Sequence, residues 1–389
     1  MSLSSIKDYD LNNKKLFIRS DLNIPIHNGI IKSTKRIDLS IPTIKYALRH
    51  GAKVILASHL GRPIEGSFDN ELSLKPIVDY LSKKLETSIE LIHDFQATDL
   101  TKLKKKIYVL ENVRFNVGEK SCEDSLSKKY GDLADIFVMD AFGTSHRKEA
   151  STFGVGKYVK HSCAGLLFCN EVEALTKALK EPSRPLVAIV GGSKVSTKLS
   201  VLKNLTKITD GLILGGGILN TFLADQGKNI GKSLYEKKFL NEARIIIEEM
   251  KKNNIFFPEI TDVVCAKNLS SNAEPFIKKT GNIKDDDMIL DLGPETLEII
   301  SDYIKKTKTI IWNGPLGVFE YDQFSLGTKK LANVIASGNS YSLAGGGDTI
   351  AAIEKFNLSK NISYISTAGG AFLEFIEGKN LPAIEILSR

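Results

Sequence analysis

The chain has 389 residues, a length typical of two or three domains. Hydrophobic residues make up 42% of it and charged residues 25%, a balance typical of a soluble globular protein and not of a disordered one. No apolar run is long enough to span a membrane, the N-terminus lacks a signal-peptide core, and the four cysteines show no C-x-x-C spacing. The sequence therefore predicts a cytoplasmic protein with reduced thiols, no zinc site and no membrane partner.

The formal net charge of +7 at pH 7 indicates an anionic partner. Nucleic acid is one such partner, but the lysines are spread along the chain and the aromatic residues, 8% of the total, form no stacking ladder. Anionic small molecules explain the charge equally well. We therefore expect small-molecule substrates and no nucleic acid.

Apolar runs and helix-like periodic segments alternate along the first half of the chain. We expect strands at 16–19, 54–57, 107–110 and 136–139, and helices at 36–50 and 75–85. Ile37, Ile41 and Ile44 lie on one stripe of the first of these helices, and Gly51 ends it. This alternation is typical of βα units that build a parallel sheet covered on both faces.

A second alternating series follows a helix predicted over about 165–180 and a proline-bracketed piece at 181–185, the best candidate linker. Strands are expected at 186–190, 211–214, 263–266, 288–292, 309–312, 341–344 and 362–365, and the clearest helix at 234–252. The sequence thus predicts an α/β protein of two doubly wound parallel-sheet halves. In such sheets, ligands bind beyond the carboxyl ends of the strands.

In the first half, basic and polar side chains follow the predicted strands or open the first helix. Arginine offers planar donors suited to carboxylate and phosphate, and it stays charged. Any one of these residues alone is most often a surface charge or a structural histidine. Their recurrence at strand ends favours a site for a small, highly anionic substrate. The candidate residues are Asp21, Asn23, Arg36, His59, Arg62, Arg114 and Arg147.

The segment GGSKVSTK, residues 191–198, joins the predicted strand at 186–190 to a helix that is expected to begin at Leu199. Two glycines on such a turn let the backbone approach a ligand, and the N–H groups of the helix start face an anion. The spacing of Lys194 and Lys198 predicts that both ammonium groups lie on one helix face. We interpret the segment as a phosphate site; the alternative is an ordinary turn with two solvated lysines.

Glycine also dominates the other strand ends of the second half, at 215–217, 313–320, 345–349 and 367–370. There the backbone could approach a base, a ribose or phosphates. Asp348 stands where a helix should begin, so it is either a helix N-cap or a ligand for Mg²⁺. Glu320 could accept hydrogen bonds from ribose hydroxyls or lie on the surface.

Several nucleotide-binding motifs are absent. Gly231-Lys232-Ser233 resembles the end of a P-loop, but Gln226 occupies the position of the required glycine. No G-x-G-x-x-G follows a predicted strand, and neither HRD nor DFG occurs. These absences argue against a P-loop enzyme, a nicotinamide dehydrogenase and a protein kinase.

The motifs RSDLNIP, HLGRP, LENVRF, DAFGTSHR, GGSKVSTK, NGPLGVFE and GGGDT, in this order, resemble the phosphoglycerate kinase family essentially from end to end. The resemblance implies two Rossmann-like domains that face each other across a cleft. The N-terminal domain would comprise 1–164 with a C-terminal return at about 377–389, the connecting helix and linker 165–185, and the C-terminal domain 186–376. One departure is Ala368, where the family usually has glycine; because alanine restricts positive φ, we expect a small change in that loop.

The resemblance also implies a function: reversible phosphoryl transfer between 1,3-bisphosphoglycerate and ADP in glycolysis, by a monomeric, Mg²⁺-dependent cytoplasmic kinase whose domains close by hinge bending. The seven residues of the first half would hold 3-phosphoglycerate, and Arg36, Lys194 and Lys198 would be catalytic. Asp348 would hold Mg²⁺. The residues implied for the nucleotide are Gly192, Lys194, Lys198, Gly216, Asn313, Pro315, Val318, Glu320, Gly346, Gly347, Asp348 and Thr349.

Two alternatives remain open at this point. One is another small-acid kinase or ligase on the same scaffold, which substrate screening would separate. The other is a basic nucleic-acid-binding protein, which salt-dependent retention on DNA without nucleotide turnover would favour.

Overall fold

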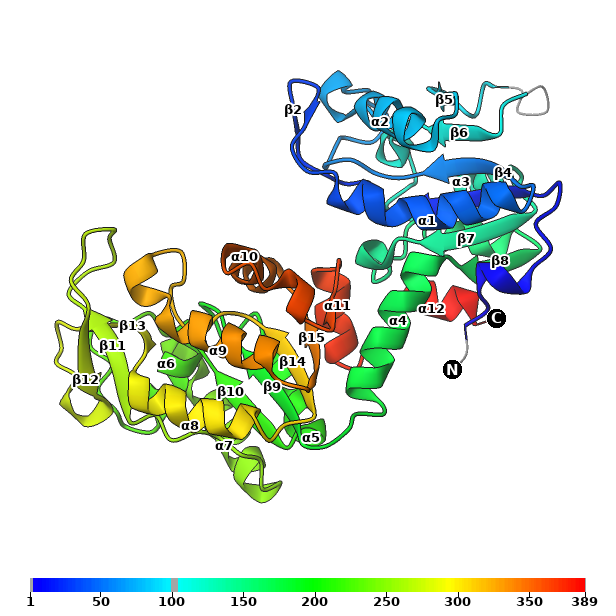
Figure 1. Cartoon of the computed structure of the whole chain (residues 1–389). Coiled ribbons are helices and arrows are strands. Elements are labelled where there is room, and N and C mark those ends of the chain that lie inside the picture. Colours follow the sequence, from blue (N-terminus) through cyan, green and yellow to red (C-terminus); the bar gives the residue numbers. More distant parts are fainter. Residues whose placement is uncertain (1–2, 99–103, 389) are drawn as a thin grey trace. The chain divides into compact units, whose positions relative to one another are not determined.

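The computed structural model describes residues 3–98 and 104–388. The chain divides into two compact units, one made of Met1–Glu173 with Asn380–Arg389 and the other of Ala174–Lys379 (Figure 1). The division falls within helix α4 (Leu166–Leu179), inside the segment 165–185 that the sequence assigns to the connection.

The first unit is built on a six-stranded parallel sheet with the strand order β5-β6-β4-β1-β7-β8. The predicted strands are confirmed, and β5 and β8 are additions. The central strands are almost wholly buried, as expected for a sheet with helices on its faces. The strands are β1 (Lys15–Ser20), β4 (Lys53–Ala57), β5 (Ile89–Ile92), β6 (Ile107–Leu110), β7 (Ile136–Asp140) and β8 (His161–Ala164), beside a small hairpin of β2 (Ile26–His27) and β3 (Ile30–Ile31).

Helices α1 (Lys35–Arg49), α2 (Lys75–Leu85) and α3 (Asp124–Gly131) belong to the same unit. The apolar stripe of α1 is confirmed: Ile37, Ile44 and Ala47 are fully buried. Burial of this stripe fixes the rotation of the helix, because neighbours on one helix face recur every three or four residues. The first turn of α1 therefore holds Arg36 next to the loop that follows β1.

A buried carboxylate caps the start of α4. Asp140, the last residue of β7, accepts hydrogen bonds from the backbone N–H groups of Leu167 at 3.0 Å and Phe168 at 3.2 Å. Burial raises the pKa of the Asp140 carboxyl to about 7, and the backbone donors partly offset this rise. The cap ties the start of α4 to the central sheet of the first unit.

The end of the chain returns to the first unit. Helix α12 (Pro382–Leu387) lies beside β8 (Figure 1), and the Ala383 N–H donates to the Ser145 carbonyl at 3.1 Å. Ser145 lies in the loop after β7 that also carries Arg147. The C-terminal segment therefore supports one of the candidate site loops.

The second unit contains a five-stranded parallel sheet with the order β10-β9-β14-β15-β16. Its strands are β9 (Leu186–Val190), β10 (Gly211–Leu214), β14 (Thr309–Asn313), β15 (Tyr341–Ala344) and β16 (Tyr364–Ile365). Helices α8 and α9 pack side by side (Figure 1). The helices of this unit are α5 (Leu199–Ile208), α6 (Gly216–Asp225), α7 (Leu240–Lys252), α8 (Pro294–Ile304), α9 (Leu326–Ser337), α10 (Gly347–Lys355) and α11 (Gly370–Ile376).

Two of the strands predicted for the second parallel series lie elsewhere. β11 (Asp262–Ala266) and β13 (Met288–Leu292) pair antiparallel with each other, and β11 also pairs with β12 (Phe276–Lys279), which the sequence did not predict. The side chains of β12 alternate between half-buried and exposed. Such alternation is typical of an antiparallel strand with one face in water.

The predicted helix at 234–252 is wrong at its start. The helix α7 begins at Leu240, after the 3₁₀ turn Lys237–Phe239. Ala243, Ile246 and Met250 form its buried stripe as predicted. Leu234 lies outside the helix and is exposed, so apolar spacing alone extends the helix too far.

In the part of the chain that the structure describes, no helix is long and apolar enough to cross a membrane. The four cysteines are free.

Candidate active site

Polar side chains after β1 and β4 and at the start of α1 are joined in the first unit. Arg36 donates to the Asp21 carboxylate at 2.9 Å and to the Asn23 carbonyl at 3.2 Å. The Asn23 side-chain oxygen accepts the backbone N–H of Gly61 at 2.9 Å. These bonds hold the two loops and the start of α1 in one arrangement, as expected for a site assembled at the carboxyl ends of parallel strands.

One buried carboxylate orients two of the candidate arginines. Arg114, 5% exposed, donates to Glu149 at 3.1 Å and to the Gly61 carbonyl at 2.8 Å. A guanidinium nitrogen of Arg147 lies 3.9 Å from the same Glu149 oxygen.

Arg62, by contrast, is exposed and has no hydrogen bond or ion pair with any residue that the structure describes. Its guanidinium is available to a ligand.

His59 lies among these cations and is 3% exposed. Its pKa lies well below the ordinary value, first because burial disfavours the charged ring and then because arginines surround it. The ring is therefore neutral at pH 7. The arginines that lower its pKa are Arg19, Arg114, Arg147 and Arg36.

The glycine turn of the second unit brings backbone segments into close contact. Gly192 and Gly216 have φ angles of +147° and +63°, in the region that favours glycine. A Cβ on Gly216 would lie 2.8 Å from the Gly192 carbonyl oxygen, and one on Gly191 would lie 1.8 Å from the Pro315 carbonyl oxygen. A side chain at Gly191 or Gly216 would clash with this backbone, so the loops can pack this closely only if both residues are glycine.

The predicted helical placement of Lys194 and Lys198 is wrong. Helix α5 begins at Leu199, so Lys198 is its N-cap residue and Lys194 lies in the preceding loop. The four-residue spacing therefore does not put both ammonium groups on one helix face. The loop is set by close backbone packing at the glycines, which a helical pattern does not describe.

Lys198 reaches across the sheet edge to Asn313, the last residue of the central strand β14. Its ammonium group donates to the Asn313 side-chain oxygen, and the Asn313 amide nitrogen donates to the Gly345 carbonyl at 2.7 Å. Burial lowers the pKa of Lys198, while the negative charges of Asp348 and Glu377 act in the opposite direction. A strand end thus holds the ammonium group in a partly desolvated position, where its charge interacts strongly with an anion.

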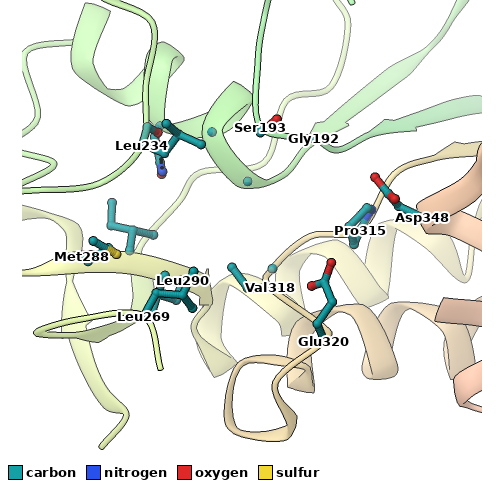
Figure 2. A pocket seen from close by; sticks show the side chains of 15 residues that line it. Gly192, Ser193, Leu234, Leu269, Met288, Leu290, Pro315, Val318, Glu320 and Asp348 are labelled. Atoms are coloured by element: carbon teal, nitrogen blue, oxygen red, sulfur yellow. Dashed lines mark hydrogen bonds between the residues drawn. The ribbon is translucent and has the colours of Figure 1, made fainter. Parts of the chain in front are cut away.

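A cavity of about 330 Å³ opens beside these groups. Figure 2 shows the carboxylates of Asp348 and Glu320 at one end, with Leu234 and Met288 at the other. One end is thus polar and the other apolar, which suits a ligand with a flat apolar part and a charged part. The lining residues are Gly192, Ser193, Gly216, Gly217, Asn220, Leu234, Leu269, Met288, Ile289, Leu290, Pro315, Gly317, Val318, Glu320 and Asp348.

Six of the predicted nucleotide residues do not line this cavity: Lys194, Lys198, Asn313, Gly346, Gly347 and Thr349. Thr349 is buried, and its hydroxyl accepts the backbone N–H of Gly314 at 2.7 Å, so it fixes the loop after β14.

Asp348, which does line the cavity, is exposed in the first turn of α10. It makes no side-chain cap; the N-cap is Gly346, with a φ of +97°. Among the described residues, the Asp348 carboxylate has no hydrogen-bond or ion-pair partner.

Ala368 fits its loop without strain. It is 1% exposed, it does not belong to the residues with positive φ, and its N–H donates to the Ser366 hydroxyl at 3.2 Å. The expected change in that loop therefore does not arise from a positive φ.

Sequence reasoning missed two groups of residues at these sites. The apolar lining residues Leu234 and Leu269, in loops, and Met288, at the start of β13, belong to no motif that marks a ligand site. Arg19 stands inside the motif RSDLNIP, but it ends the predicted strand 16–19 and is not among the residues predicted for the acid site. Only its complete burial, rare for arginine, marks it as exceptional.

Comparison with known proteins agrees with this geometry. The family model described as phosphoglycerate kinase matches residues 6–379. The chain belongs to the phosphoglycerate kinase family. A phosphoglycerate kinase of Vibrio campbellii is 53% identical over 387 residues, covering 100% of this chain and 99% of that protein. One of Francisella philomiragia is 52% identical over 387 residues, covering 100% and 98%.

Solved phosphoglycerate kinase structures share the fold. The structure from Coxiella burnetii has a TM-score of 0.96 and 48% identity, and the match covers 100% of this chain and 99% of that one. The structure from Pyrococcus horikoshii has a TM-score of 0.81 and 29% identity, with 99% and 98% covered. The chain is thus a phosphoglycerate kinase-family enzyme that carries out reversible phosphoryl transfer in glycolysis, and the two alternative functions are not favoured.

Proposed function

We propose that this chain transfers a phosphoryl group reversibly between 1,3-bisphosphoglycerate and ADP, and that the first unit holds the acid. The observation that carries this proposal is the cluster of arginines around a neutral His59, in which Arg36 donates to Asp21 and Arg114 donates to the Gly61 carbonyl. The arginines suit a phosphate and a carboxylate. Asp21 suits the hydroxyl group of the substrate, because its carboxylate can accept a hydrogen bond from that hydroxyl. Asn23, Arg62 and Arg147 complete the proposed acid site.

The nucleotide is proposed to occupy the cavity of the second unit. Its base would pack at the apolar end beside Leu234 and Met288, and Glu320 would accept from the ribose hydroxyls. Its phosphates would lie near Lys198, where the glycine loops let backbone N–H groups approach. Lys194, exposed in the loop before α5, would add a second cation.

The chemistry requires positioning and charge neutralisation. The attacking and leaving oxygens are already anionic, so no general base is needed. The transferred phosphoryl group passes through a loose transition state with the two oxygens in line. Arg36 and Lys198 are proposed to stabilise the charge that spreads over its oxygens, one from each unit.

The donor set of the second unit fits Mg²⁺ bound together with a nucleotide. Magnesium in such sites takes one or two carboxylates plus phosphate oxygens and waters. Asp348 offers one carboxylate without a partner among the described residues, and no cluster of three or more His, Cys, Asp or Glu side chains occurs in residues 3–98 and 104–388. Bound Mg²⁺ would neutralise phosphate charge, and Asp348 would hold it.

Asp348→Asn tests this assignment. We expect Mg²⁺ to strengthen ADP binding to the native chain, and the variant to lose about tenfold or more of that gain, because losing even an outer-shell partner of a metal ligand costs about 10–100-fold in metal affinity. Without Mg²⁺, the variant should bind ADP as well as the native chain or better, since a negative charge beside the phosphates is gone. Calorimetry of ADP binding with and without Mg²⁺ measures both effects.

The matched control is Asp302→Asn, which removes an exposed carboxylate of α8 that pairs with Lys305 on the surface. It should bind ADP like the native chain under both conditions. Equal enhancement by Mg²⁺ in the native chain and in Asp348→Asn would show that Asp348 is not the ligand.

Because the two substrates are proposed to bind separate units, turnover requires the units to bring them within reach and to exclude water. We propose that residues 165–185 are the mechanical link for this hinge bending. Small-angle X-ray scattering should give a smaller radius of gyration with both substrates bound than with either alone. No compaction with both substrates would rule out closure.

The proposal also includes a monomer that works in the cytoplasm, as the family resemblance implies. Sedimentation equilibrium across a range of protein concentrations would reveal any self-association.

A further inference from the structure

We propose that Arg19 sets the tautomer of His59, so that the imidazole stays neutral and presents a protonated Nε2 to the acid substrate. Arg19 would thus be a positioning residue that acts through His59. The tautomer follows from the geometry of the free enzyme, whereas its consequence for substrate binding rests on the proposed function.

The Arg19 guanidinium is fully buried and held on three sides. Its Nε donates to the Ser151 hydroxyl at 2.9 Å, and one terminal nitrogen donates to the Ser20 carbonyl at 2.5 Å. The other terminal nitrogen lies 3.2 Å from Nδ1 of His59. A guanidinium has only donors, so Nδ1 of His59 must be the acceptor and carries no proton.

The position of the ring proton follows from this bond. A neutral imidazole with an unprotonated Nδ1 carries its proton on Nε2. Nε2 of His59 has no hydrogen-bond partner among the described residues. The ring therefore holds a free N–H donor in the middle of the arginine cluster, available to a carboxylate or phosphate oxygen.

A second pair of buried side chains fixes Arg19 itself. The Ser151 hydroxyl donates to Glu119 at 2.6 Å, so its lone pairs are directed toward the Nε–H of Arg19. Ser151 and Glu119 are both fully buried. A continuous chain of hydrogen bonds thus runs from Glu119 through Ser151 and Arg19 to His59.

The charges around His59 also favour a neutral ring with an unprotonated Nδ1. Protonation of Nδ1 would break the bond to Arg19 and place an imidazolium beside four arginines: Arg19, Arg114, Arg147 and Arg36. Arg19 remains charged even though burial lowers its pKa, because nearby Glu149, Glu119 and Asp21 act in the opposite direction. A bound acid would therefore meet a neutral donor that needs no proton uptake.

Nitrogen NMR of the native chain labelled with ¹⁵N-histidine tests the tautomer directly. The chain has six histidines, and the resonances of His59 are assigned by their loss in His59→Gln. At pH 7 we expect a protonated Nε2 and an unprotonated Nδ1. A protonated Nδ1, with or without a protonated Nε2, would overturn the proposal.

Two variants then distinguish the effect of the Arg19 hydrogen bond to Nδ1 of His59 from the effect of a neighbouring positive charge. Arg19→Met removes both the donor to Nδ1 and a cation, so we expect a mixture of tautomers and a higher His59 pKa. Arg147→Met removes a neighbouring cation only, so the pKa should rise while the Nε2–H tautomer persists. Identical tautomer populations in Arg19→Met and the native chain would show that Arg19 does not set the tautomer.

Ser151→Ala serves if Arg19→Met does not fold, because it keeps every charge and removes only the hydroxyl that holds Nε of Arg19. We expect it to weaken the preference for the Nε2–H tautomer, and an unchanged preference would contradict the proposed chain of bonds.

Titration of each folded variant with 3-phosphoglycerate measures substrate binding separately. If the native chain shows the expected tautomer but does not bind 3-phosphoglycerate, the proposed function fails while the tautomer assignment stands.

Discussion

Lys198→Ala is expected to lower kcat by about 10²–10³, the loss typical of removing one preorganised donor to a transition state. The ammonium group is partly desolvated and held by Asn313 at the end of the central strand, so little reorganisation is needed when charge develops on the transferred group. Because this contact would strengthen in the transition state, kcat and kcat/KM should fall together. Steady-state kinetics with ATP, 3-phosphoglycerate and Mg²⁺ measures both.

The matched control is Lys203→Ala, which removes an exposed lysine of the same helix, α5. Its kinetics should equal those of the native chain, so a loss confined to Lys198→Ala would not reflect net charge. A rise in KM for ATP with kcat unchanged would limit Lys198 to ground-state binding.

Arg36→Ala is the second variant with a large expected effect, again about 10²–10³ in kcat. Arg36 lies in the first turn of α1 and bonds to Asp21, one of the proposed substrate ligands. Its loss removes a cation from the proposed transition state and leaves the Asp21 carboxylate beside the substrate without that counter-charge. The kinetic parameters for 3-phosphoglycerate in the ATP-consuming direction measure the effect.

Arg49→Ala is the control, because Arg49 is an exposed arginine in the last turn of the same helix. Both variants place alanine in α1, a favourable change for a helix, so neither should unfold it. An Arg36→Ala enzyme that turned over at the native rate and only showed a higher KM would remove Arg36 from the transition state.

Much of the fold is predictable because the central strands are continuous apolar runs and the helices carry a buried stripe. β9 (Leu186–Val190) is an example, since all five of its residues are buried. β8 (His161–Ala164) was not predicted, because it begins with an exposed histidine and gains its place by pairing with β7. The antiparallel pairing of β11 and β13 likewise depends on partners distant in sequence, which a local pattern does not reveal.

The candidate site is predictable where strand ends carry unusual residues. His59 and Arg114 stand out because parallel strands end at one edge of the sheet. In the structure, Gly61 of the His59 loop accepts a hydrogen bond from Arg114 and donates one to Asn23. The placement of Lys194 and Lys198 failed because backbone packing at glycines, and not helix geometry, sets that loop. The support of His59 by Arg19 was not predictable, since it depends on a hydrogen bond between residues 40 positions apart.

Phosphoryl transfer to 3-phosphoglycerate, and the part of Lys198 in it, is tested most directly by ATP consumption. The native chain and Lys198→Ala are compared with 3-phosphoglycerate and Mg²⁺ while a coupling dehydrogenase removes the product. We predict rapid turnover by the native chain that depends on 3-phosphoglycerate, and a turnover lower by about 10²–10³ in the variant. If Lys198→Ala turned over as fast as the native chain, the proposed reaction would stand, but Lys198 would not stabilise its transition state. A native chain that consumes ATP with another small acid but not with 3-phosphoglycerate would contradict the proposed substrate.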